Sequence, residues 1–174
     1  TATTDQYNLL RRMVTLFDTS SIGSGSTITP GSNTYSLFGT GKAEEMTGTS
    51  INVVVCAPTS NTALAASDYD IAKWTMTSQV TAVITLASWS TTAYNDFTLS
   101  ATGEGNISKT GITKFGAVTN WDQSNTAPTW VSSAVVQGQC NDAGAAGTGN
   151  DPKLVVIYTT AGGGTFKALL GVGI

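Results

Sequence analysis

Two tryptophans frame a polar loop in the second half of the chain. Trp121 and Trp130 stand at its ends, and Asp122 and Gln123 lie between them. Indole faces stack on the C–H faces of sugars, while carboxylate and amide groups bind sugar hydroxyls. These four residues therefore form a candidate sugar platform. The alternative is that both tryptophans close the ends of a hydrophobic core.

Paired carboxylates are the second feature that could support chemistry. Asp68 and Asp70 stand two residues apart, so an extended backbone would place both side chains on one face. Such a pair could bind Ca²⁺ or act as an acid and a base, although a plain loop pair is the simpler interpretation. The glycine-rich loop 141–152 also carries oxygen ligands, but without the alternating order and final Glu of an EF-hand. We therefore predict no metal site and no cofactor.

The chain contains no histidine, which removes the commonest general base and the commonest metal ligand. A nucleophilic serine would then need a lysine, and the neighbours Ser108 and Lys109 would point to opposite faces of a strand. The sequence has no Gly-x-Ser-x-Gly elbow, and the glycine run 162–164 is not followed by a phosphate-binding helix pattern. We therefore predict no catalytic residues and a protein that is not an enzyme.

Composition narrows the class of protein further. Charged residues make up 11% of the 174 residues, well below the roughly 25% of ordinary soluble domains. The net charge is −3 and the eight cationic residues are scattered, which argues against nucleic-acid binding. Since no apolar run reaches the roughly 18 residues of a membrane span, we expect no membrane insertion either. A neutral, hydroxyl-rich surface suits extracellular or virion proteins.

Two cysteines leave two alternatives open. Cys56 ends an apolar run, and Cys140 follows the segment 130–139. A disulfide between two strands is possible in an oxidising compartment, and two unpaired thiols are the other interpretation. Because the sequence has no Cys-x-x-Cys spacing, a zinc site is not expected.

Short strands separated by turn residues dominate the chain. The expected strands are 9–17, 34–40, 50–57, 79–86, 112–119, 130–139 and 153–160. The strand at 79–86 is favoured by an alternation that places four apolar residues on one face, Val80, Ala82, Ile84 and Leu86. A short helix or loop fits 101–109, and polar loops fit 120–129 and 141–152. This pattern predicts an antiparallel β-sandwich or barrel.

The apolar C-terminal tail carries the sharpest hypothesis. We divide the chain into a β-sandwich domain at 1–160 and a glycine hinge with an apolar tail at 161–174. The tail's candidate assembly residues are Phe166, Ala168, Leu169, Leu170 and Val172. The tail could be a final strand of its own sandwich, or it could leave the domain and complete a neighbour's sheet. Glycine accepts nearly any backbone conformation, so the run at 162–164 favours a change of direction.

Several segments resemble a known family. LRRMVTLFDTSSI at 10–22, GSTIT at 25–29 and DPKLVVIYT at 151–159 resemble the opening and the closing strand of DNRLRE-type domains. The middle of the chain, YNDFTL at 94–99 and ISKTGITKFG at 107–116, is similar to uncharacterised phage and virome proteins of that shape. The resemblance covers roughly residues 9–160.

The resemblance implies an all-β fold, a single antiparallel, jelly-roll-like β-sandwich used as an accessory module. Some relatives bind polysaccharide, and many belong to surface or virion proteins. Such domains carry a further strand upstream, where this chain has only residues 1–8; either these residues fill that place or the sheet has an open slot. Unpaired strand edges invite a strand from another chain.

From these observations we predict a structural assembly protein that associates through its termini. Its setting would be a phage virion, as a capsid decoration or a fibre or tail component, or an extracellular filament. The expected partners are copies of itself or other virion or filament proteins, and possible surface glycans. A carbohydrate-binding module is the alternative function.

Overall fold

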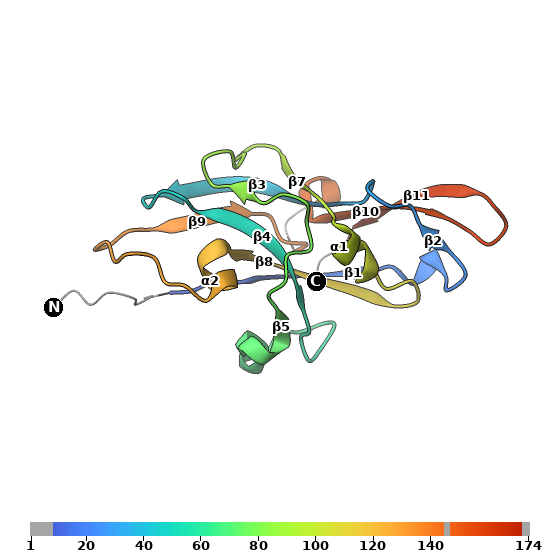
Figure 1. Cartoon of the computed structure of the whole chain (residues 1–174), viewed down its shortest axis with the longest axis horizontal. Helices are drawn as coiled ribbons and strands as arrows, with labels where there is room; N and C mark the ends of the chain where they lie inside the picture. Colours follow the sequence, from blue (N-terminus) through green and yellow to red (C-terminus); the bar gives the residue numbers. More distant parts are fainter. Residues whose placement is uncertain (1–8, 145–146, 172–174) are drawn as a thin grey trace.

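Two antiparallel β-sheets face each other and enclose the core of the molecule (Figure 1). The computed structural model describes residues 9–144 and 147–171. Every strand pair in this part of the chain is antiparallel. The all-β antiparallel sandwich predicted from the sequence is therefore confirmed.

The first sheet has five strands in the order β1-β8-β4-β5, with β6 paired to β4. Its strands are β1 (Met13–Asp18), β4 (Ser50–Cys56), β5 (Trp74–Thr75), β6 (Ile84–Thr85) and β8 (Ile112–Thr119). Strand β8 lies at the centre, because it pairs with β1 on one side and with β4 on the other. Strand β1 forms one edge of this sheet.

The second sheet has six strands in the order β11-β10-β3-β7, with β2 paired to β10 and β9 paired to β3. Its strands are β2 (Thr27–Ile28), β3 (Thr34–Glu44), β7 (Tyr94–Thr98), β9 (Val136–Cys140), β10 (Lys153–Thr159) and β11 (Thr165–Gly171). The long strand β3 changes partner along its length: its first half pairs with β7, and its second half pairs with β9.

Short helices connect the strands. Two are single α-helical turns, α1 (Ala101–Gly105) and α2 (Asn120–Ser124). The side chains of Ser100 and Thr119 cap these turns by accepting hydrogen bonds from backbone N–H groups, as N-cap residues do. In the described part of the chain there are also four 3-10 turns, at Ser20–Ile22, Ala66–Tyr69, Ile71–Lys73 and Thr148–Asn150.

An aromatic cluster fills the space between the two sheets. The ring centroid of Tyr35 lies 6.0 Å from those of Phe17, Phe97 and Phe115, and all four side chains are fully buried. Burial of a hydroxyl without a partner is costly, and Thr15 resolves this problem: its Oγ1 lies 3.1 Å from the Tyr35 hydroxyl. The Oγ1 of the same threonine also donates to the Phe115 carbonyl oxygen, at 2.9 Å.

The strand predicted at 79–86 is wrong. Only Ile84–Thr85 forms a strand there, and Val80 makes an isolated bridge to Leu99. The apolar alternation is real at its ends, because Val80 and Leu86 are buried. Ala82 between them is exposed, so the segment contributes to the core through two separate anchors. The polar loop expected at 120–129 begins with the helix α2.

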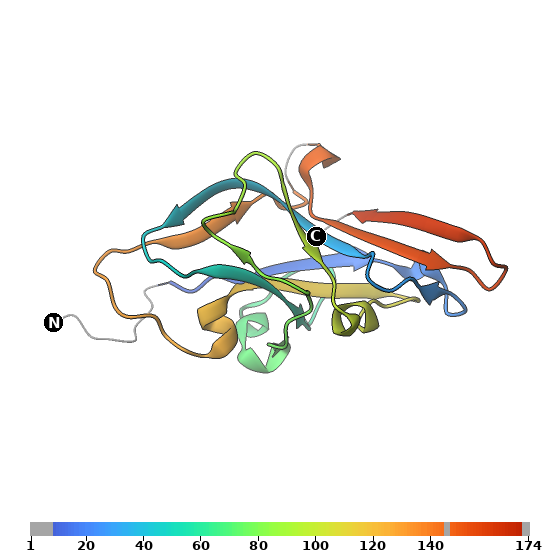
Figure 2. The same cartoon turned by 45° about the horizontal axis from the view of Figure 1, so that its top comes forward.

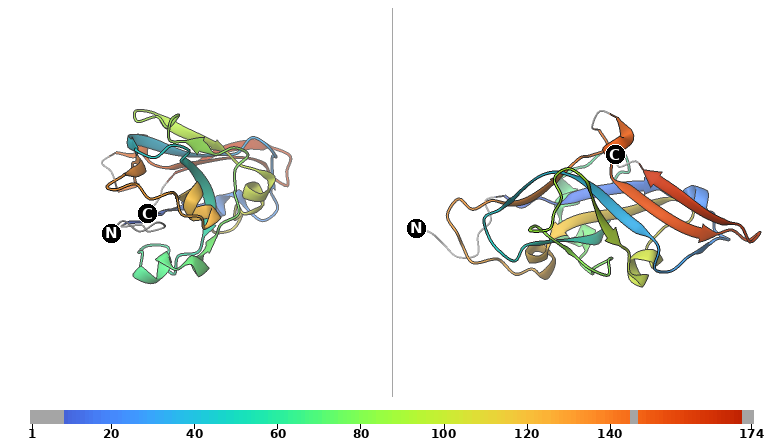
Figure 3. Two further views of the ribbon diagram at one scale, coloured as in Figure 1. Left: turned by 60° about the vertical axis from the view of Figure 1, so that its left-hand side comes forward. Right: turned by 90° about the horizontal axis from the view of Figure 1, so that it is seen from above.

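The C-terminal tail folds back onto its own sheet. Strand β11 pairs with β10 along its whole length, from Thr159 opposite Thr165 to Lys153 opposite Gly171. Figures 2 and 3 show this hairpin reaching past the end of the sandwich body. Of the two alternatives for the tail, the structure therefore has the final strand of the chain's own sandwich. Val172 and the N-terminal residues 1–8 lie outside the described residues.

Candidate functional site

Strand β11 forms one edge of the six-stranded sheet. On its inner side it pairs with β10, and within the part of the chain that the structure describes no strand pairs with its outer side. The predicted assembly residues Phe166, Ala168, Leu169 and Leu170 all belong to this strand. An unpaired strand edge presents a row of backbone donors and acceptors to which another chain can add a strand. We therefore take this edge, defined by Thr165–Gly171, as the candidate site.

A tight turn fixes the position of β11 against β10. The N–H of Gly163 donates to the carbonyl oxygen of Thr160, and the N–H of Thr160 donates to that of Gly164. Gly163 has a positive φ of 84°, the left-handed conformation that this type of hairpin loop requires and glycine adopts without strain. The glycine run at 162–164 thus closes a hairpin within the sheet.

Phe166 joins the free edge to the body of the sandwich. Its ring stacks on that of Tyr158, with the centroids 6.0 Å apart and the planes 28° apart. Tyr158 is buried, whereas Phe166 remains 50% exposed. A half-exposed aromatic residue therefore lies at the edge where backbone groups are also unpaired.

An edge of the opposite sheet lies nearby. Strand β1 is the edge of the opposite sheet, and it comes close to β11 without pairing with it. Two edge strands from different sheets therefore lie on the same side of the molecule. A strand from another chain could add to either of them.

The residues of the predicted sugar platform make contacts inside the chain. Asp122 accepts two hydrogen bonds from Arg12, and Gln123 binds the amide of Asn52 and the carbonyl oxygen of Met76. The side chains of Trp121 and Trp130 are half-buried. The indole N–H of Trp130 is buried, and no described residue accepts a hydrogen bond from it. The platform stays a prediction, but its two polar groups already have protein partners.

On the outer face of the five-stranded sheet, Arg12 makes hydrogen bonds to two other segments of the chain. Its guanidinium bonds both carboxylate oxygens of Asp122, at 2.7 and 2.8 Å, and the carbonyl oxygen of Tyr69, at 2.7 Å. It also lies 4.7 Å from the ring centroid of Tyr69 and 5.3 Å from that of Trp74. The hydrogen bonds to Asp122 raise the pKa of Arg12 above its usual value. Arg12 stands one residue before β1, and nothing in the sequence indicated Asp122 as its partner.

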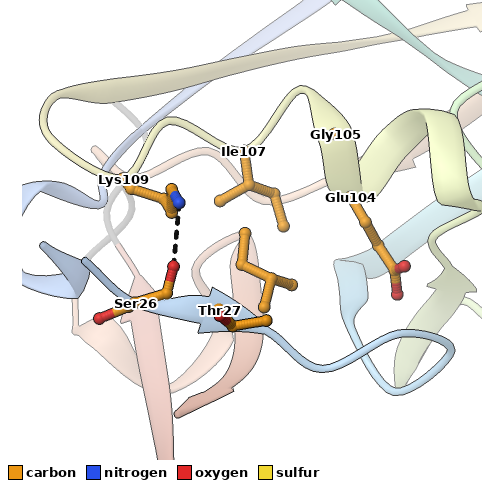
Figure 4. A pocket seen from close by; sticks show the side chains of 7 residues that line it. Ser26, Thr27, Glu104, Gly105, Ile107 and Lys109 are labelled. Atoms are coloured by element: carbon orange, nitrogen blue, oxygen red, sulfur yellow. Dashed lines mark hydrogen bonds between the residues drawn. The ribbon is translucent and has the colours of Figure 1, made fainter. Parts of the chain in front are cut away.

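A cavity of about 370 Å³ opens at the same end of the molecule as β2. Figure 4 shows Glu104 and Lys109 at its two ends, with Ile107 between them. Lys109 donates to the carbonyl oxygen of Ser26 at 2.9 Å. Glu104 is buried, and its Oε1 accepts from the N–H of Gly31 and from the Asn33 amide, both at 2.7 Å.

The polar ends and the apolar wall of this cavity suit a small polyol. Among the described residues, none donates a hydrogen bond to Oε2 of Glu104, so this oxygen can accept a bond from a ligand. The ammonium group of Lys109 keeps protons beyond the one it gives to Ser26. No pattern in the sequence indicated this site, because its residues come from two segments that are about 80 positions apart.

Both cysteines are free thiols. Of the alternatives left open by the sequence, the structure has the unpaired one, and the possible Cys56–Cys140 disulfide is absent. Burial raises the pKa of Cys56 to about 12 and that of Cys140 to about 11, so neither thiol is a reactive nucleophile near neutral pH. The Sγ of Cys140 lies 3.2 Å from the Sδ of Met13.

The carboxylate pair at 68 and 70 is divided between two structural roles. Asp68 is buried and accepts hydrogen bonds from the N–H groups of Thr59 and Ala65, and these bonds lower its pKa. Asp70 caps the turn at Ile71–Lys73. Across residues 9–144 and 147–171, no three acidic or cysteine side chains gather where they could hold a metal ion. In the same residues, no helix is long and apolar enough to cross a membrane.

Comparisons with known proteins identify no relative: no protein-family model, no curated protein and no solved structure matches the chain. The resemblance to DNRLRE-type domains therefore stays a prediction.

Proposed function

We propose that this protein is a structural assembly module that self-associates through the free edge of β11. The observation that carries this proposal is a seven-residue edge strand whose outer side has no partner in the described part of the chain. Addition of a strand to such an edge is a recurrent mode of recognition, in which backbone hydrogen bonds provide most of the affinity. The setting is a virion or an extracellular filament, as the sparse charge and the hydroxyl-rich surface suggest.

The sparse edge protection of β11 supports this role. Natural proteins block free edges with prolines, bulges or charged side chains, lysine above all. Strand β11 contains no proline and one lysine, and its register with β10 runs without a shift. By contrast, the pairing of β3 with β9 shifts register between Gly39 and Gly41. An assembly module needs one accessible edge of this kind, and a monomer would gain nothing from it.

Sedimentation of the whole chain over a wide concentration range tests this proposal. We expect the average mass to rise from the monomer value of 17.9 kDa as concentration increases. The variant Leu169→Pro, which removes one N–H of β11, should remain a monomer. The matched control Leu169→Thr keeps that N–H and should associate like the native chain. A native chain that stays monomeric at the highest concentration would refute self-association.

A second candidate function, carbohydrate binding, is favoured by the cavity between Glu104 and Lys109. A volume of about 370 Å³ is within the range of small-ligand sites, and its apolar wall could face the C–H groups of a sugar ring. Titration of a monosaccharide panel, observed by saturation-transfer NMR, tests it. Binding of one sugar that is lost in Glu104→Gln and kept in Trp121→Ala would assign the site to this cavity. The reverse pattern would return it to the tryptophan platform.

A further inference from the structure

The direction of each backbone group on β11 follows from the hairpin. Hydrogen-bonded and non-hydrogen-bonded pairs alternate along an antiparallel ladder. The N–H of Thr160 bonds the carbonyl oxygen of Gly164, so the next pair, Thr159 with Thr165, is a non-hydrogen-bonded one. Continued along the strand, this alternation turns the backbone groups of every second residue outward: Thr165, Lys167, Leu169 and Gly171.

The opposite side of β10 confirms this assignment. Ile157 pairs with Lys167. The carbonyl oxygen of Ile157 accepts from the N–H of Thr29, and its N–H donates to Oδ1 of Asn33, both at 2.8 Å. Both polar groups of Ile157 therefore face away from β11, as they must in a non-hydrogen-bonded pair.

We infer that two copies of the chain join β11 to β11 in antiparallel orientation, with the two-fold axis at Ala168. This inference rests on the proposed function and adds the partner and the register. With Ala168 opposite its own counterpart, the four outward-facing residues of one copy meet those of the other in four hydrogen-bonded pairs: 165 with 171, 167 with 169, and their symmetry equivalents. Each such pair exchanges two bonds, so the edge gains about eight.

Neighbouring registers are less favourable. A two-fold axis at Lys167 or at Leu169 leaves one end unpaired and gives three hydrogen-bonded pairs, with about six bonds. The axis at Lys167 would also set the two lysines directly opposite each other, and like charges in this arrangement destabilise a strand pair. The axis at Ala168 places Lys167 opposite Leu169 of the second copy instead. The self-complementary pairing of one edge is the isologous contact that a two-fold dimer requires.

The pairing would merge the two sheets. In each copy, the six-stranded sheet has four strands in its main order, β11-β10-β3-β7. The dimer would therefore present eight strands side by side. Sheets of this width occur in soluble proteins. The edge strand β1 would stay free in each copy, and further contacts of the assembly could form there.

Disulfide trapping tests the register. In a non-hydrogen-bonded pair the two Cα atoms lie about 4.5 Å apart, within the range that a disulfide spans. Single cysteines are introduced as Lys167→Cys, Ala168→Cys and Leu169→Cys in a Cys140→Ser background, because Cys140 is partly accessible. After mild oxidation we expect Ala168→Cys to give a covalent dimer in at least tenfold greater yield than the other two.

A control and three contrary outcomes complete the design. The variant Gly162→Cys, in the exposed hairpin loop, measures collisional cross-linking. Strongest trapping of Lys167→Cys or Leu169→Cys would overturn the register. Self-association in solution without trapping at any of the three positions would overturn the β11–β11 pairing and leave the proposed function standing, for example through β11 and β1. A native chain that is monomeric throughout would remove both.

Discussion

On the outer face of the five-stranded sheet, charged and polar groups find partners within the chain, whereas along the outer edge of β11 the backbone groups find none in the described residues. Arg12 uses three of its nitrogens on Asp122 and Tyr69. Both carboxylate oxygens of Asp68 accept hydrogen bonds, one from the N–H of Thr59 and the other from the N–H of Ala65. Along the edge of β11, the N–H and C=O groups of every second residue, from Thr165 to Gly171, point outward.

This difference separates groups that stabilise the fold from groups that are available to another chain. A polar group buried with its partner contributes mainly to folding, and its loss leaves a partner unsatisfied. An exposed edge group bonds water in the monomer, so its replacement changes folding little and association strongly. Substitutions in the two regions should therefore fall into two classes, and the following variants test that division.

The largest effect on folding is expected from Asp122→Ala. The side chains of Arg12 and Asp122 are 6% and 5% exposed, so the variant leaves a buried guanidinium without its carboxylate. Loss of one partner of such a pair costs about 3–5 kcal/mol of unfolding free energy. Urea unfolding monitored by tryptophan fluorescence measures it.

The double variant Arg12→Met with Asp122→Leu distinguishes the pair's charge from its packing. It should recover most of the lost stability, since well-packed apolar residues can replace a buried ion pair. A single variant that unfolds like the native chain would mean that this face does not stabilise the fold.

The next effect in size is expected from Gly116→Ala at the centre of β8. A Cβ at this position would overlap the ring of Trp74 and lie 2.9 Å from the carbonyl oxygen of Met13. Overpacking of this kind costs about 1–3 kcal/mol. The matched control is Gly105→Ala, where a Cβ would meet open space, and it should change the unfolding midpoint little. Equal midpoints for the two variants would contradict the tight packing of Trp74 on β8.

The sequence was most informative where strands are long and regular. The expected segments at 34–40, 50–57, 112–119 and 153–160 correspond to β3, β4, β8 and β10, because β-branched and aromatic residues there are bounded by turn residues. The same signal failed at 79–86. There Gln79 donates its N–H to the carbonyl oxygen of Val53 and accepts from the N–H of Ser100, so local packing overrides the apolar alternation.

The candidate edge was predictable only in part. The apolar residues of the tail allowed a final strand, and the glycine run indicated a change of direction. Pairing of the strand with β10 depended on the hairpin formed by Thr160, Gly163 and Gly164. The sequence was equally compatible with this hairpin and with a tail that pairs with a neighbouring chain. The Arg12–Asp122 pair and the Glu104–Lys109 cavity join distant segments, and a single sequence carries no signal for such contacts.

A smaller, pH-dependent effect is expected from Asp68→Asn. Hydrogen bonds, first that from Ala65, lower the pKa of Asp68 in the folded state. A carboxylate with a depressed folded pKa stabilises the protein above its unfolded pKa of about 4, and this contribution is lost as the pH falls. The native chain should therefore exceed the variant in stability at pH 7, and the difference should shrink below about pH 4.

Unfolding by urea at a series of pH values measures this difference. Asp96→Asn, at an exposed position on β7, is the control and should parallel the native chain. A difference between Asp68→Asn and the native chain that stays constant from pH 7 to strong acid would show that the carboxylate's charge plays no part.

The smallest effect on folding is expected from Phe166→Ala, which lies where the two regions meet. This residue is half exposed and its ring stacks on the buried Tyr158, so we expect a loss of about 0.5–1.5 kcal/mol of unfolding free energy. All backbone groups of β11 remain, and the association constant should therefore fall by less than about tenfold, which corresponds to 1.4 kcal/mol.

The variant Leu169→Pro should show the opposite balance, with association lost and the fold retained. Because these two substitutions lie three residues apart on one strand, sedimentation and urea unfolding of both variants separate the side-chain contribution of the edge from its backbone contribution. Association that is abolished by Phe166→Ala and unaffected by Leu169→Pro would mean that an apolar contact, and no strand pairing, holds the copies together.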